Sequence, residues 1–220
     1  LRLDQKVLDA ALILSSPDDK QLAEMNLTGA GEEEGLTFEG VGAYTVKVRG
    51  VGTPKMVGSY RLEMAIQPTP GESDRKYLTA QNLLLESIEL AKQNPKPPLL
   101  FEKLDQSLAM WSSLDQPFWQ LLTLKEIGRA NMSPNRYDKA IAAQEQAIAI
   151  SQRLKNRVRE GVIINDLANS YFNQQQYEKA TEYFRQAITI FREVKDRRRE
   201  GLMIYALGNT QNRMNLQTDA

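Results

Sequence analysis

The sequence predicts an α+β multidomain protein, in which a small antiparallel β-sandwich precedes an all-α solenoid of helical hairpins. Residues 1–66 contain short runs in which apolar and polar side chains alternate, separated by Gly, Pro and Asp. Residues 67–76 contain two prolines and a glycine and no large apolar side chain, which is typical of a linker. From residue 77 onward helix formers dominate, and the sequence repeats with a period of 40.

Composition excludes several classes of function. The chain has 220 residues with a net charge of zero, 41% hydrophobic and 25% charged residues, which is the composition of an ordinary globular protein. It contains no His and no Cys, so catalysis by Ser-His-Asp or Cys-His groups and zinc binding by His or Cys are excluded. The sequence therefore favours a binding role over an enzymatic one and predicts neither a metal nor a cofactor.

Charge and hydropathy also limit the partners. The pI of about 6.7 is far from that of a basic nucleic-acid-binding domain, which is usually above about 9. The apolar runs, such as 10–14, are much shorter than the roughly 20 residues of a membrane-spanning helix. We therefore expect a protein or peptide partner, with no nucleic acid and no membrane span.

The strands expected in residues 1–66 follow from a period of two. Apolar and polar side chains alternate after Tyr44 and again over 60–64, which is typical of half-buried strands. Turn formers at 15–20 and glycines between the runs separate these segments. Short strands with such turns predict a small antiparallel sandwich.

The repeats from residue 77 onward predict stacked helical hairpins. The segment 137–140 recurs at 177–180, and 146–150 recurs at 186–190. Within one unit, the apolar spacing over 162–173 and over 177–194 is near 3.6, so each unit is expected to hold two helices. The expected units are 77–117, 118–157, 158–197 and an incomplete 198–220.

Small residues at fixed places in the repeat allow its helices to cross closely. Ala168, Ala180 and Ala187 supply such positions, and the aromatic residues Tyr171 and Phe184 fill the space around them. One unit earlier Asn131 and Gln144 replace these two aromatic residues, so we expect looser or wetter packing there.

These residues carry a family resemblance. Leu167, Ala168, Tyr171, Ala180, Phe184 and Ala187 resemble the tetratricopeptide repeat (TPR) in its variant of about 40 residues, well over 118–220 and weakly over 77–117. The resemblance implies that the first helix of each hairpin lines a concave groove for an extended peptide or a partner domain. The side chains expected in this groove are Lys125, Arg129, Asn165, Asn169, Tyr205 and Asn209. The alternative is that they are polar residues of a solvated helix face.

The first 66 residues resemble a second family. The segments 8–24, 42–48 and 58–62 are similar to the bacterial pre-peptidase C-terminal domain, a β-sandwich whose opening strands we expect to be missing before Leu1. A sandwich of this kind followed by 40-residue repeats resembles the front part of CHAT-domain peptidases, whose catalytic His and Cys would lie beyond Ala220.

Two functions remain open. In the first, the chain is a non-catalytic interaction scaffold. In the second, it is the regulatory front of a CHAT-type cysteine peptidase, whose proteolysis depends on what the repeats bind. The expected partner is a protein or peptide ligand or, alternatively, the chain's own missing C-terminal domain. The sandwich resemblance favours an exported protein, and a bacterial cytoplasmic one stays open.

Three other motifs have structural interpretations that we prefer. The acidic residues 32–34 near 18–19 could hold calcium but lack EF-hand spacing, so we expect a solvated loop. The arginines 197–199 are flanked by acidic residues and are expected at a helix junction. Trp111 and Trp119 are expected in the core of the first hairpin junction.

Overall fold

The computed structural model describes residues 71–133 and 135–218 and, before them, the backbone of six strands; side chains are described for Ser15, 71–133 and 135–215. Residues 1–85 and residues 86–220 form two compact units, and each is described by itself.

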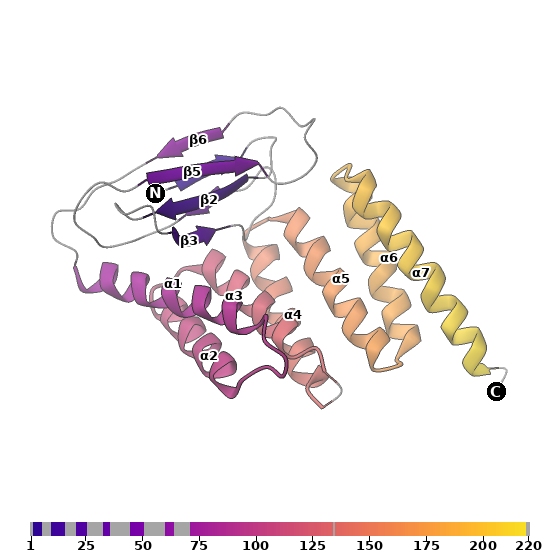
Figure 1. Ribbon diagram of the computed structural model, residues 1–220. Coiled ribbons are helices and arrows are strands. Elements are labelled where there is room, and N and C mark those ends of the chain that lie inside the picture. Colours follow the sequence, from indigo (N-terminus) through magenta and orange to yellow (C-terminus); the bar gives the residue numbers. More distant parts are fainter. Residues whose placement is uncertain are drawn as a thin grey trace. The chain divides into compact units, whose positions relative to one another are not determined.

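Six short strands lie in the first unit. They form two three-stranded antiparallel sheets, ordered β4-β1-β6 and β3-β2-β5. Strands β2, β3, β5 and β6 are labelled in Figure 1. In the second sheet Leu12 of β2 lies opposite Val48 of β5. The strands are β1 (Arg2–Gln5), β2 (Ala10–Ser15), β3 (Gln21–Met25), β4 (Glu33–Gly35), β5 (Thr45–Gly50) and β6 (Tyr60–Glu63).

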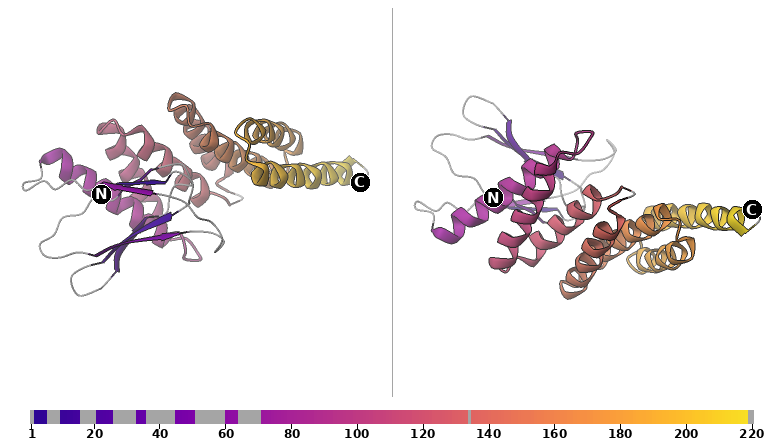
Figure 2. Two further views of the ribbon diagram at one scale, coloured as in Figure 1. Left: turned by 90° about the horizontal axis from the view of Figure 1, so that it is seen from above. Right: turned by 90° about the horizontal axis from the view of Figure 1, so that it is seen from below.

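Seven helices follow the strands. They are α1 (Glu72–Leu90), α2 (Pro98–Ser113), α3 (Pro117–Ala130), α4 (Tyr137–Arg153), α5 (Arg157–Asn173), α6 (Tyr177–Glu193) and α7 (Arg197–Thr218). From α2 to α7 each helix contacts the next one along the chain, and the row they form can be followed in Figure 2.

The predicted fold class, with its β-sandwich, is wrong. The part of the chain with described side chains, 72–215, holds seven helices and no strand, and is consistent with a helical-hairpin solenoid and not with a sandwich. Alternation of apolar and polar side chains along the chain identifies a strand. It does not determine how the side chains of two sheets pack against each other, and this packing is what defines a sandwich. The predicted turn at 15–20 lies mostly outside the described residues, and so do Tyr44 and Met64.

The helical part repeats at the predicted period. Helices α3, α5 and α7 begin at 117, 157 and 197, and α4 and α6 begin at 137 and 177. The connections between successive hairpins repeat as well, because Asp115, Lys155 and Lys195 all adopt a positive φ of 47° to 60°. This left-handed conformation is a common way to end a helix.

Helix α1 begins inside the range that we expected to be a linker. Glu72 and Asp74 lie in its first turn, where acidic side chains interact favourably with the helix dipole. The Gly71 N–H donates a hydrogen bond of 2.9 Å to Asp74 Oδ2, which helps to fix this first turn. The linker composition over 67–70 is therefore followed at once by helix.

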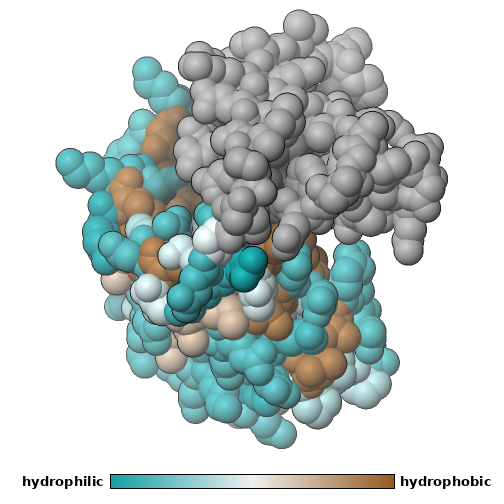
Figure 3. Space-filling view, turned by 90° about the vertical axis from the view of Figure 1, so that its left-hand side faces the viewer, coloured by the Kyte–Doolittle hydropathy of each residue, from teal (hydrophilic) through white to brown (hydrophobic). Residues whose placement is uncertain are grey.

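The core of the last hairpins is built from small and aromatic residues that interlock. Ala168, Ala180 and Ala187 are fully buried, as their predicted role at helix crossings requires. Phe184 and Phe191 fill the space beside them, with about 1% of their surface exposed. On the face shown in Figure 3, the coloured surface of the chain is mainly hydrophilic, with separate hydrophobic patches.

Trp111 and Trp119 lie in the core, as predicted. Both are buried, and their rings stack with centroids 5.0 Å apart at an angle of 15°. This offset stacking joins the end of α2 to the start of α3.

Asn131 and Gln144, the polar residues that replace the two aromatic residues in the earlier unit, are buried as well. Gln144 lies against Gly128 and accepts a hydrogen bond of 2.8 Å from Ser170 Oγ of α5. Asn131 donates to the Ile127 carbonyl at 2.8 Å. Packing at Gln144 is therefore tight and hydrogen-bonded, in contrast to the looser packing that we expected.

Helix α5 begins with a side-chain cap that recurs one unit later. The Arg159 N–H donates to Asn156 Oδ1 at 3.0 Å, and the Arg199 N–H donates to Asp196 Oδ1 at the same distance. Gln176, at the corresponding place before α6, makes no such bond. We expect Asn156→Ala to lower the free energy of unfolding by about 1 kcal/mol. Gln176→Ala should cost clearly less, and urea denaturation of the two variants compares them; equal losses would contradict the assigned cap.

Candidate functional site

The six predicted groove residues lie on the first helices of the hairpins. Lys125, Asn165 and Asn169 are half-buried, whereas Arg129, Tyr205 and Asn209 are exposed. Lys125 and Arg129 belong to α3, Asn165 and Asn169 to α5, and Tyr205 and Asn209 to α7. Each pair is separated by one helical turn and therefore lies on one face of its helix.

A pocket joins α3 to α5 at two of these residues. It has a volume of about 390 Å³ and is lined by Arg129, Met132, Gln144, Asp166, Asn169 and Asn173. We call it the α3–α5 pocket. It brings Arg129 and Asn169 together, while Lys125, Asn165, Tyr205 and Asn209 are not among its lining residues.

Asp166 is the ionisable residue of this pocket that sequence reasoning missed; Met132, Gln144 and Asn173 were not predicted as site residues either. Burial raises the pKa of its carboxyl group to about 6, although attraction by Lys125 and Arg129 opposes this shift. Burial also lowers the pKa of Lys125. The sequence contained one indication that Asp166 could belong to the site. It follows the predicted groove residue Asn165, and it lies 40 residues after Glu126, which is also acidic.

Hydrogen bonds within the helices determine which groups the pocket presents. The Asn169 amide donates to the Asn165 carbonyl at 2.9 Å and to Asn165 Oδ1 at 3.1 Å. Both of its N–H donors are thus used within α5, so its side-chain oxygen is the group that it can offer a ligand. Arg129 forms an ion pair of 3.3 Å with Glu126 and keeps further donors on its guanidinium group.

One residue that lines the pocket, Gln144, takes part in a buried polar contact between hairpins. Ser170 Oγ donates to Gln144 Oε1, and both side chains are almost fully buried. A satisfied buried hydrogen bond of this kind fixes the distance between the helices that carry it. Gln144, which lines the α3–α5 pocket, is therefore held by α5.

The ionisation of Asp166 should make stability depend on pH. Its pKa is raised from 3.8 to about 6 on folding, so the folded state binds the proton more tightly and the free energy of unfolding falls as pH rises through this window. We expect Asp166→Asn to stabilise the protein by roughly 1–3 kcal/mol above about pH 7.

The same variant should change stability little below about pH 3, where the carboxyl group is protonated in both the folded and the unfolded state. Urea denaturation across this pH range measures the difference. A variant that is equally or less stable at every pH would contradict the assigned burial of Asp166.

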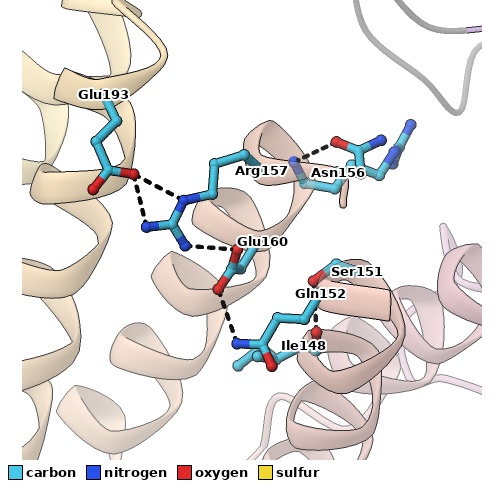
Figure 4. A network of polar contacts seen from close by, with 8 residues as sticks. Ile148, Ser151, Gln152, Asn156, Arg157, Glu160 and Glu193 are labelled. Carbon is cyan, nitrogen blue, oxygen red and sulfur yellow. Dashed lines mark hydrogen bonds and ion pairs between the residues drawn. The ribbon is translucent and has the colours of Figure 1, made fainter. Parts of the chain in front are cut away.

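A second pocket, of about 410 Å³, lies between α4, α5 and α6 beside a network of ion pairs. Arg157 Nη1 contacts Glu160 at 2.7 Å, and Arg157 Nε donates to Glu193 Oε2 at 2.9 Å (Figure 4). Gln152 completes the network by donating to Glu160 at 2.9 Å. The hydrogen bonds to Glu160 and Glu193 raise the pKa of Arg157, as expected for a structural ion pair.

This network recurs one unit later and includes Arg197 and Arg199. Arg192 and Arg197 both bond to Glu200 at 2.9 Å, and Arg199 forms an ion pair with Asp196. Arg197 and Arg199 therefore have acidic partners at a helix junction, which agrees with the structural interpretation of this run.

Metal binding requires a cluster of acidic side chains, and a membrane span requires a long apolar helix. Among residues with described structure, no three acidic side chains come close enough to hold a metal ion. Residues 18, 19 and 32 of the calcium alternative lie outside the described residues, and the side chains of 33–34 are not described. None of the described helices is long and apolar enough to cross a bilayer.

The comparisons with known proteins agree with the helical architecture. A family model described as tetratricopeptide repeat matches residues 162–194, which comprise most of α5 and all of α6. No curated protein matches the chain. The family match does not extend to residues 1–66, so the resemblances to the pre-peptidase and CHAT families are not supported. The match and the seven helices of 72–215 support a tetratricopeptide-repeat protein, and such a repeat suggests a protein-interaction scaffold.

Proposed function

We propose that the chain is a non-catalytic scaffold that binds an extended peptide, or an extended segment of a partner domain, along α3, α5 and α7. The observation that carries the proposal is the α3–α5 pocket, which places a guanidinium, a carboxylate and an amide oxygen on the first helices of two adjacent hairpins. Tetratricopeptide repeats generally mediate protein–protein binding and are usually non-catalytic, which supports the same function.

The chemistry of the pocket suits the backbone of a peptide. Arg129 offers N–H donors to a carbonyl or carboxylate oxygen, and Asn169 offers an oxygen to a backbone N–H. Asp166 can accept a second N–H or pair with a basic side chain. Because these contacts address both groups of a peptide unit, the pocket needs no particular ligand sequence to bind.

A selection of peptides tests the proposal. Random peptides displayed in a library are enriched on the full chain, and the affinity of an enriched peptide is then measured by fluorescence anisotropy. We expect the double variant Arg129→Ala, Asn169→Ala to bind it roughly tenfold or more weakly, because each lost hydrogen bond is worth about 1 kcal/mol.

Gln186→Ala is the matched control, because Gln186 is exposed on α6, a second helix of a hairpin, and should leave the affinity unchanged. The double variant Asn169→Ala, Asn209→Ala tests whether the groove continues onto α7. Equal affinity of the wild type and the Arg129/Asn169 variant, or failure of the full chain to bind any peptide of the library, would refute the proposal.

A further inference from the structure

The carboxyl group of Asp166 lies at the α3–α5 pocket without a bonded partner. The residue is half-buried and lines the pocket on α5. Among the described side chains, none forms an ion pair or a hydrogen bond with this carboxyl group, and burial raises its pKa to about 6. It is therefore mostly ionised at pH 7, and a carboxylate that is removed from water without a partner is costly. A ligand that brings a positive charge to Asp166 would reduce this cost.

The charged groups that act on Asp166 all belong to α3. They are Lys125, Glu126 and Arg129, and the attraction by the two cations does not outweigh the effect of burial. Arg129 is paired with Glu126 at 3.3 Å, so a carboxylate of its own helix already engages its guanidinium group. Helix α4 contributes the neutral Gln144 to the pocket. The two cations and the two carboxylates cancel, so these groups present no excess positive charge that would repel a cationic ligand.

Two oxygen acceptors lie on the face of α5 that lines the pocket. Asp166 and Asn169 are three residues apart and therefore share one face of the helix. Both N–H donors of the Asn169 amide are used within α5, which leaves its side-chain oxygen for a ligand. Ammonium and guanidinium groups carry several N–H donors each, so one such group can bond to both oxygens.

The size and the wall of the pocket suit the aliphatic stem that carries such a group. Its volume of about 390 Å³ is within the range of small-ligand pockets, roughly 300–1,000 Å³. Met132 lines the pocket, and its Sδ atom lies 3.1 Å from Ser170 Oγ of α5. Lysine and arginine bury their stems on apolar surface and keep the charged end at polar groups. A basic side chain therefore matches both the apolar and the polar part of the lining.

We infer that the peptide bound along α3, α5 and α7 places a lysine or arginine side chain in the α3–α5 pocket, where its charged group bonds to Asp166 and Asn169. This inference rests on the proposed function and adds a preference to it. Contacts to the peptide backbone admit any sequence, and a basic residue at one position strengthens binding. An acidic side chain or a terminal carboxylate fits this position less well, because the carboxylate of Asp166 would repel it.

The peptide library tests this preference on the full chain. Peptides enriched on the wild type should share a lysine or an arginine at one position, and peptides enriched on Asp166→Asn should not. Replacing the shared basic residue of an enriched peptide with norleucine should weaken binding to the wild type roughly tenfold or more, because a charged hydrogen bond is lost. The same replacement should change binding to Asp166→Asn much less. Gln186→Ala, the control outside the pocket, should behave as the wild type does.

Proton release is a readout that a purely structural role of Asp166 would not produce. A bound cation lowers the pKa of a carboxyl group, so binding at pH 6 should release about half a proton per peptide. The chain contains no His, whose ordinary pKa also lies near this value. Isothermal titration calorimetry in two buffers with different ionisation enthalpies measures the release, which Asp166→Asn and the norleucine peptide should each abolish.

The outcomes separate this inference from the proposed function. Enriched peptides that share no basic residue, or proton uptake on binding, would overturn the inference. If the Arg129→Ala, Asn169→Ala variant still weakened binding of such peptides, the proposed function would stand. Equal losses from norleucine on the wild type and on Asp166→Asn would also overturn the inference, since the basic side chain would then lie elsewhere. A full chain that binds no peptide would refute both.

Discussion

Replacing Phe184 with alanine should lower the free energy of unfolding by about 3–5 kcal/mol. Phe184 is 1% exposed and lies in the cluster formed by Tyr171, Ala180 and Ala187. Truncation removes the burial of a whole ring and leaves a cavity that the surrounding helices close only in part. Urea denaturation followed by circular dichroism measures the loss.

The matched control lies one unit earlier. Gln144 occupies the equivalent position and contributes a hydrogen bond to Ser170 in place of an aromatic ring. We expect Gln144→Ala to cost about 1–2 kcal/mol, which is the loss of this buried contact. If the two substitutions had equal effects, the 40-residue correspondence between these positions would be contradicted.

Replacing Gly161 with leucine should destabilise the protein by about 3 kcal/mol, at the upper end of the usual range for overpacking. Even a Cβ atom at this position would lie closer to Ile190 than real Cβ contacts do. Phe191 is about 1% exposed, so its ring has little room to move away from the leucine. The thermal midpoint of the variant reports the effect.

Gly201→Leu is the control for Gly161→Leu, because the two glycines stand 40 residues apart in the same repeat position. Gly201 has open space around its Cα, so leucine should leave stability unchanged or raise it by about 0.5–1 kcal/mol through its higher helix propensity. A loss of stability as large as that of Gly161→Leu would show that α7 is covered within this chain.

The helical half of the fold was predictable because its period appears in the sequence. The apolar spacing over 177–194 predicted a helix there, and α6 spans Tyr177–Glu193. The positions of Ala180 and Ala187 were predictable too, because only small side chains allow helices to cross closely. The prediction of a β-sandwich failed, since the alternation of apolar and polar side chains indicates the two faces of a strand and not what packs against them.

The candidate site was predictable only in outline. The helical periodicity placed Arg129 and Asn169 on the first helices, and the pocket contains both. The burial of Asp166 and the ion pair of Arg157 with Glu193 depend on how one hairpin stacks on the next. A single sequence gives the spacing within a helix but not the tilt between helices, so these contacts required the structure.

The measurement that tests the groove most directly is the map of amide chemical shifts in an isotope-labelled chain on addition of an enriched peptide. The groove account predicts that the largest changes fall on α3 and α5, around Arg129, Asp166 and Asn169, and continue on α7 near Asn209. Changes concentrated on α4 and α6 instead would contradict it, because the ligand would then occupy the second helices of the hairpins.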